Sequence, residues 1–191
     1  MKNTITNHLH RSVVLLTAAI ILTATIINVY GDDSNRATKS EFYGRQDFTW
    51  PYPFHIIKWG QAFRDEKGNL HIKNRIWTAP FWYTIGGDGS TPARVYTVYN
   101  SVTDQAGNGP KHGQMIIFNG GVDDVPTDET TLWDATWHGM FVDGAYSGKF
   151  QGQGYGDFAG TEIMGTIERC LECDPYSIFD LEGQILYPHG E

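Results

Sequence analysis

The stretch 131–169 reads TLWDATWHGMFVDGAYSGKFQGQGYGDFAGTEIMGTIER, and its side chains change character at every second residue. Successive side chains of a β-strand point to opposite faces, so a period of two predicts strands with one buried face. Asp143-Gly144 separates two such runs, and an Asp-Gly pair in that position is a strong hairpin signal. We therefore predict antiparallel strands joined by tight turns.

Glycine recurs through the same stretch, although glycine weakens a plain strand. Besides Gly144 of the turn, the positions are Gly139, Gly148, Gly152, Gly154, Gly156, Gly160 and Gly165. Glycine inside a strand usually marks curvature, a bulge or close backbone approach, and a sheet that closes on itself needs these features. We predict an all-β fold, an antiparallel closed or nearly closed β-barrel of roughly eight strands, with a β-sandwich as the alternative.

Further alternating runs lie on both sides of this stretch. Strands are expected at 54–63, 70–77, 81–85, 94–103, 114–118 and 176–188. Loops rich in glycine, aspartate and asparagine separate several of them, and no amphipathic helix longer than a turn or two is expected. A meander of short strands favours the barrel.

The N-terminus has the pattern of an export signal, because Lys2 and Arg11 precede the uncharged apolar run 12–29. Cleavage after Gly31 is the preferred interpretation, and an uncleaved membrane anchor is the alternative. Either places the rest of the chain outside the cytoplasm, at the cell surface or beyond it. The predicted organisation is a signal peptide or anchor helix at 1–31, a flexible polar leader at 32–47 and one barrel domain at 48–191.

The charge balance excludes some partners. The formal net charge is −8, and loss of residues 1–31 would leave 12 basic against 22 acidic side chains, a net charge of −10. A surface this acidic disfavours nucleic acid and anionic lipid. We expect no nucleic-acid partner and membrane contact only through an uncleaved N-terminal segment, and the sequence leaves a homo-oligomer open.

Cysteine occurs only as Cys170 and Cys173. Outside the cytoplasm so close a pair is more often oxidised than free, so we predict a disulfide that stiffens a short loop. A free or intermolecular pair is the alternative. Zinc would need two further ligands, and a redox motif would need a helix after the strand.

An acidic loop is the only calcium candidate, and it contains Asp123, Asp124, Asp128 and Glu129. Calcium takes six to eight oxygen ligands, but this spacing matches no EF-hand and exposed charge clusters are usually just solvated. We expect no metal and no cofactor. Glu162 and Glu168 share a strand face as a carboxylate pair, but alternation opposite Ile163 places both toward solvent.

Aromatic side chains are the better functional clue, at 14% of the chain with six tryptophans. They suit a barrel core and also the wall of a cavity for an apolar or sugar ligand. The ligand-binding candidates are Trp77, Tyr96, Tyr99, Trp133, Trp137 and His138.

The run FQGQGYGDFAG at 150–160, followed by Gly165 and Ile167, resembles the Gly-x-Gly-x-Phe-x-Gly signature of dirigent and allene oxide cyclase barrels. It is also similar to related bacterial lipocalin-like domains, within the calycin-like class. The resemblance covers about forty residues and implies an eight-stranded antiparallel barrel with an apolar cavity. The acidic and tyrosine residues that those families use for catalysis have no alignable counterparts, so no catalytic role is carried over.

These observations favour a secreted or cell-surface barrel that binds a small apolar or aromatic ligand without turnover. One alternative is an extracellular structural or self-assembling surface protein, in which the polar leader pairs with a neighbour's sheet edge. Another is a cyclase-like or isomerase-like barrel enzyme, whose marker would be a polar pair deep inside an apolar interior.

Overall fold

The computed structural model describes residues 38–47, 55–121, 123–171 and 178–188. The chain divides into two units, 1–36 and 37–191, and everything described belongs to the second. The predicted signal or anchor at 1–31 therefore lies outside the described residues. Within the described ranges the chain contains no α-helix, and so none that is long and apolar enough to cross a membrane.

Ten strands and one 3-10 turn make up this unit. They are β1 (Lys39–Gln46), β2 (His55–Lys58), β3 (Gln61–Arg64), β4 (Leu70–Ile85), β5 (Thr91–Thr103), β6 (Gly109–Phe118), β7 (Thr131–Val142), β8 (Ala145–Gly154), η2 (Gly156–Phe158), β9 (Glu162–Arg169) and β10 (Phe179–Leu186).

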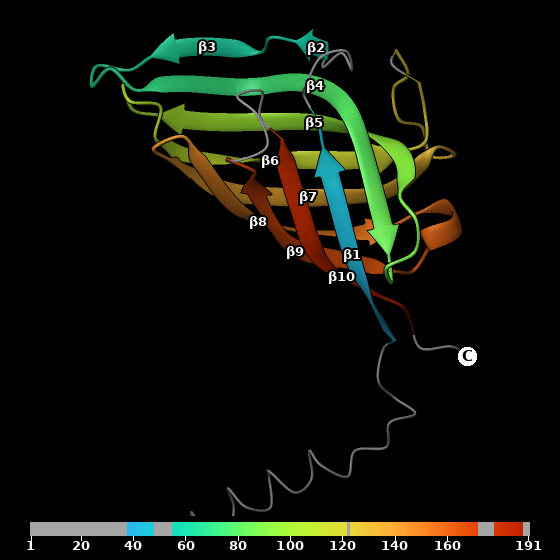
Figure 1. Cartoon of the computed structure of the whole chain (residues 1–191). Coiled ribbons are helices and arrows are strands. Elements are labelled where there is room, and N and C mark those ends of the chain that lie inside the picture. The colour runs from blue at the N-terminus through green and yellow to red at the C-terminus, as the bar shows by residue number, and fades with distance from the viewer. Residues whose placement is uncertain (1–37, 48–54, 122, 172–177, 189–191) are drawn as a thin grey trace, which may run out of the picture. The chain divides into compact units, whose positions relative to one another are not determined.

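Eight of the strands form a closed antiparallel barrel, which confirms the predicted fold class. From β4 to β10 each strand pairs with the next along the chain, and β10 pairs with β1. β1 then pairs with the second half of β4, from Phe81 to Ile85, and this pairing closes the sheet. Figure 1 shows β4 bending sharply so that its second half meets β1.

The first half of β4 has different neighbours. β3 pairs with it from Leu70 to Lys73, and β2 pairs with it from Ile76 to Thr78. The barrel wall is therefore extended by two short strands where β1 has already ended (Figure 1). The predicted single strand at 54–63 is interrupted at Gly60, which has φ 71° and faces the Lys73 carbonyl so closely that a Cβ would clash.

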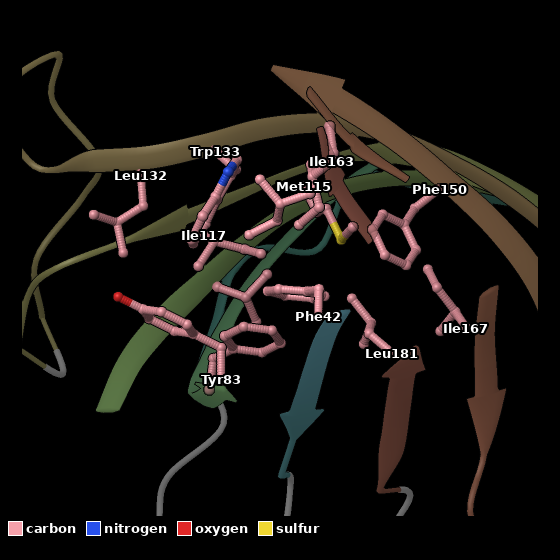
Figure 2. Close-up of a cluster of buried hydrophobic side chains, with 14 of the residues drawn as sticks. Phe42, Tyr83, Met115, Ile117, Leu132, Trp133, Phe150, Ile163, Ile167 and Leu181 are labelled. Carbon is pink, nitrogen blue, oxygen red and sulfur yellow. The ribbon is translucent and has the colours of Figure 1, made fainter. Parts of the chain in front are cut away.

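The core fills the barrel, and Figure 2 shows its side chains converging from the surrounding strands. It consists of Phe42, Ala79, Phe81, Tyr83, Val95, Met115, Ile117, Leu132, Trp133, Ala135, Tyr146, Phe150, Ile163, Ile167, Leu181 and Ile185. Most of these residues alternate with outward-facing ones, as the period of two predicts.

Glycines let neighbouring strands approach where the wall curves. Gly165 of β9 lies opposite Gly183 of β10, and a Cβ on either one would clash with a carbonyl oxygen of the other strand. Only glycine fits such a contact without a backbone shift. The interpretation of the glycines as a device for closing the sheet is consistent with this geometry.

The prediction that residues 32–47 form a flexible leader is wrong for Lys39–Gln46. This segment is β1, and it completes the barrel. The polar side chains of the segment face outward, while the inward positions are Phe42, Gly44 and Gln46. With one large apolar residue among the three, the inward face carries too weak a hydrophobic signal to stand out in the sequence.

Separate strands were predicted at 70–77 and 81–85, but these segments form one continuous β4 with Pro80 inside it. Pro80 lies between two pairings on this side of β4. The pairing with β2 ends at Thr78, and the pairing with β1 begins at Phe81. Proline is confined to such places because it donates no ladder hydrogen bond.

Candidate functional site

The two ends of the barrel differ in packing and charge. The end that we call the Trp133 end carries the connections 86–90 and 155–161. The opposite end, the Lys111 end, carries the connections 104–108 and 143–144. Both are built from the same strands, so their differences come from the inward-facing residues of each half.

The Trp133 end is closed by aromatic packing. Trp133 has no exposed surface, and its ring centroid lies 4.1 Å from that of Phe158 in η2. Tyr83 packs edge-on against Trp133 at 5.3 Å, and Phe42 does so at 5.8 Å. Figure 2 shows Trp133, Tyr83 and Phe42 around the same space. A ligand at this end would have to displace the core.

Half-buried aromatic side chains gather at the Lys111 end, on the inward faces of several strands. They are Trp77, Tyr99, Trp137, Phe141 and Phe179. The Tyr99 and Trp137 rings are 6.4 Å apart, and buried Tyr146 lies between Trp137, at 6.1 Å, and Phe179, at 5.7 Å. Partly exposed rings on a common inner wall give an apolar ligand a surface to pack on.

Lys111 of β6 belongs to the same inner wall. It lies opposite Ser101 and Gly139, and its Nζ is 3.8 Å from the centroid of the Phe141 ring. The side chain is half-buried. Burial, followed by the charges of Arg75 and Arg169, lowers the pKa of Lys111 to about 8. An ammonium group is thus held in a place that disfavours its charge.

Arg75 of β4 and Arg169 of β9 are the other two cations of this end. Arg75 donates Nη1 to the Tyr99 hydroxyl at 3.2 Å and Nε to the Trp59 carbonyl at 3.2 Å. Arg169 donates Nη1 to the Gly144 carbonyl at 2.8 Å, while its Nε is buried without a partner. None of the three cations forms a salt bridge with an acid of the described residues.

Within the part of the chain that the structure describes, the inner wall carries no counterion. Among the inward-facing positions of the eight described barrel strands there is no aspartate or glutamate. In a chain with an excess of acids, three cations on one apolar wall are an unusual concentration of positive charge.

Tyr146 adds an unpaired donor to this wall. The residue is 4% exposed and its hydroxyl has no hydrogen-bond partner. The hydroxyl lies over Gly139 and Gly148, because a Cβ on either glycine would approach it to 2.5 or 2.7 Å. Burial raises the pKa of Tyr146 well above its usual range, so the hydroxyl keeps its proton at neutral pH.

The six predicted ligand-binding residues separate into three groups. Trp77, Tyr99 and Trp137 are inward and half-buried at the Lys111 end, and they are the part of the set that the structure brings together. Trp133 is core at the opposite end. Tyr96 and His138 alternate with inward residues and lie on the outer face of the sheet.

Four residues of the Lys111 end were not predicted as site residues: Lys111, Arg75, Arg169 and Tyr146. Arg169 continues the inward series of Ile163 and Ile167 by a period of two, so its position was readable. The position of Arg75 was not readable from the sequence, because a bulge between Ile72 and Arg75 exchanges the inward-facing and outward-facing residues of β4. At the bulge Asn74 has φ 53°.

The calcium candidates do not form a site. Among the described residues no group of three or more histidines, cysteines and acids could hold a metal ion. The Asp124 carboxylate accepts a hydrogen bond from the Gly121 amide, and Asp123 and Asp124 lie near the buried guanidinium of Arg94. These acids therefore have roles within their own loop and its neighbour.

The carboxylate pair and the cysteines give no second site. Glu162 and Glu168 are exposed on the outer face of β9, as predicted. Cys170 follows β9, but Cys173 lies outside the described residues, so the disulfide stays a prediction.

Comparisons of the chain with protein-family models, with curated proteins and with solved structures gave no match. The class that the fold defines is a closed eight-stranded antiparallel β-barrel extended by two short strands. We interpret the site from its own geometry.

Proposed function

We propose that this protein is a secreted or cell-surface barrel that binds a small apolar or aromatic ligand at the Lys111 end, without turnover. The observation that carries the proposal is the difference in packing between the ends. Trp133, Phe42 and Tyr83 at the Trp133 end are buried, at 0%, 2% and 8% exposed, whereas Trp77, Tyr99 and Trp137 are half-buried on the inner wall. Aromatic surface left accessible on a concave wall suits ligand contact.

The inner wall also supports binding in preference to catalysis. Its inward-facing described residues include no carboxylate, so Lys111, whose pKa is lowered to about 8, has no carboxylate partner for proton transfer among them. General acid–base chemistry of the glycosidase kind has no pair of groups here. Membership of the calycin-like class is part of this proposal, since a closed eight-stranded barrel with a ligand at one end is what the resemblance implies.

Tryptophan fluorescence tests the proposal directly. The purified protein is titrated with the neutral probe 2-naphthalenemethanol, and we expect a saturable change in emission because Trp77 and Trp137 face the ligand. Trp137→Leu should reduce the change and weaken binding, whereas Trp82→Leu, a tryptophan on the outer side of β4, should leave binding unchanged. The absence of any saturable change would contradict the proposal.

Self-association is the second candidate, and the β2–β3 edge favours it. Among the described strands these two pair only with β4. They and their link expose Ile57, Trp59 and Phe63, at 46%, 67% and 46%. An exposed strand edge with apolar side chains is a template for pairing with another chain. Sedimentation of a strict monomer at high concentration would dispose of this candidate.

A further inference from the structure

The Lys111 end contains more positive charge than its own structure uses. Lys111, Arg75 and Arg169 come from three different strands, and the first two face the same aromatic wall. The strand register brings Lys111 next to Gly139, which faces Gly148 on β8. Neither glycine has a side chain, so the space beside Lys111 is occupied by the Tyr146 ring and its hydroxyl.

Charges in such a place are costly unless something compensates them. A half-buried ammonium loses hydration, and two neighbouring guanidinium groups add repulsion. Contact of Nζ with the Phe141 ring recovers part of this cost but supplies no countercharge. The described residues provide no carboxylate to pair with Lys111.

Three polar atoms at the same end are buried without partners. They are the Tyr146 hydroxyl, on a side chain that is 4% exposed, the Nε of Arg169 and the hydroxyl of Ser101, which lies opposite Lys111. Buried donors in folded proteins nearly always have an acceptor, and the exceptions call for an explanation. All three groups can donate a hydrogen bond, and they share an end of the barrel with three cations. One acceptor carrying negative charge would satisfy the whole set.

Resting on the proposed function, we infer that the ligand is an apolar or aromatic acid, whose anionic head group is held by Lys111 with Tyr146 and Arg169 while its apolar body packs on Trp137 and Tyr99. The assignment explains why cations are kept on an apolar wall. It also explains why the inward-facing positions of the described strands lack acids, since an inward carboxylate would compete with the ligand for the same donors.

Matched probes separate this inference from the proposed function on which it rests. Binding of 2-naphthoate and of neutral 2-naphthalenemethanol to the purified protein is measured by calorimetry at pH 7. We expect the acid to bind about 10-fold more tightly or better, the value of one charge-assisted hydrogen bond. Equal affinities would overturn the inference and leave the proposed function standing. Binding of neither probe would overturn both.

Lys111→Met should remove the preference for 2-naphthoate while retaining the affinity for the neutral probe, because an apolar chain of similar length keeps the wall packed. The control is Lys149→Met, which removes the same charge from the exposed outer face of β8. Loss of the preference in both variants would point to the overall charge of the protein and overturn the inference.

Tyr146→Phe deletes only the unpaired hydroxyl. We expect a several-fold loss of affinity for 2-naphthoate, unchanged binding of the neutral probe and an unfolding midpoint at least as high as that of the parent protein. An unchanged affinity for 2-naphthoate would remove Tyr146 from the site.

The pH profile gives a readout that a structural role would not move. The titratable groups facing Lys111 are Arg75, Arg169, Tyr99 and Tyr146, and the pKa of Lys111 itself is lowered to about 8. Affinity for 2-naphthoate should fall as the pH rises from 8 to 10, and the Lys111→Met profile should be flat there. A flat profile in the parent protein would contradict the assignment of Lys111.

Discussion

The two ends of this barrel are made from the same strands but carry opposite kinds of interior. β7 contributes Trp133 to one end and Trp137 to the other, two positions apart on the inward face. Trp133 is completely buried against Phe158 and Tyr83, whereas Trp137 is half-buried beside Tyr99. One residue type on one strand thus stabilises the fold at one end and leaves surface accessible at the other.

Under the proposed function, stability and ligand binding depend on opposite ends of the barrel. Apolar side chains pack against one another at the Trp133 end, as a core requires, although the Nε1 of Trp133 is itself buried without a partner. The Lys111 end also has buried donors without partners and, in addition, three cations that pair with no carboxylate of the described residues, which are costs to folding. Functional sites are where proteins retain such costs.

The largest expected effect compares the two tryptophans. Trp133→Ala should lower the free energy of unfolding by about 3–5 kcal/mol, because it removes a fully buried ring and leaves a cavity. Trp137→Ala should lower it by about 1–2 kcal/mol, since that ring already contacts solvent. Chemical denaturation followed by circular dichroism measures both. Equal losses would remove the distinction between the ends.

Barrel closure predicts the next effect. Gly165→Ala should cost about 2–3 kcal/mol, because its Cβ would clash with the Glu182 carbonyl across the β9–β10 pair and force a backbone shift. Gly89→Ala is the matched control. Gly89 lies in a turn with nothing near the added Cβ, so its substitution should change stability by less than about 0.5 kcal/mol. Similar costs at both positions would argue against close strand approach at Gly165.

Lys111→Met should raise the free energy of unfolding at pH 7, by about 1–2 kcal/mol after solvent screening is allowed for. The pKa of Lys111 is lowered to about 8 in the folded state, from 10.5. Between these values the unfolded chain binds more protons, so the parent protein gains stability as the pH rises from 8 toward 10. The variant should lack this gain.

Above pH 10 the free energy of unfolding should fall again with rising pH, so the measurement is made between pH 8 and 10. Burial and the hydrogen bond to Asp180 raise the pKa of Tyr43 to about 12, and burial also raises the pKa of Tyr146. Unfolded tyrosines lose their protons near pH 10, so stability falls there in both proteins. A parent protein whose stability is flat from pH 8 to 10 would contradict the buried state of Lys111.

The smallest expected effect lies on the outer face. The Asp180 carboxylate accepts hydrogen bonds from Arg45 at 2.7 and 3.2 Å and from the Tyr43 hydroxyl at 2.7 Å, and these bonds connect β10 to β1. Asp180→Asn should cost about 1 kcal/mol, because the pair is partly exposed. Asp134→Asn, which affects an exposed bond to Gln114, should cost less. A larger loss for Asp134→Asn would mean that the β1–β10 contact contributes little to closure.

The barrel was predictable from the sequence because its signals are local. Alternation in 131–169, the Asp143-Gly144 turn and the spaced glycines all depend on neighbouring residues. β1 was missed because Gly44 and Gln46 occupy its inward positions, so its hydrophobic signal is carried by Phe42 alone. Its place in the sheet depends on pairing with β10 and β4, which no local pattern encodes.

The candidate site was predictable only in part, for the same reason. Trp77, Tyr99 and Trp137 were singled out as aromatic residues on strands, and closure of the barrel brings them to one end. Tyr96 and His138 lie on the outer face of the sheet, and predicting this would have required knowing which residues of their strands face inward. The convergence of the three cations depends on strand register and on the β4 bulge, and the sequence shows neither.

The most direct test of the account is the ¹⁵N–¹H spectrum of the six tryptophan indoles during a titration with 2-naphthoate. The account predicts that the Trp77 and Trp137 signals move saturably while the Trp133 signal stays in place, because the ligand enters only at the Lys111 end. Movement of the Trp133 signal with Trp77 and Trp137 unchanged would contradict it, as would a spectrum in which no indole signal moves.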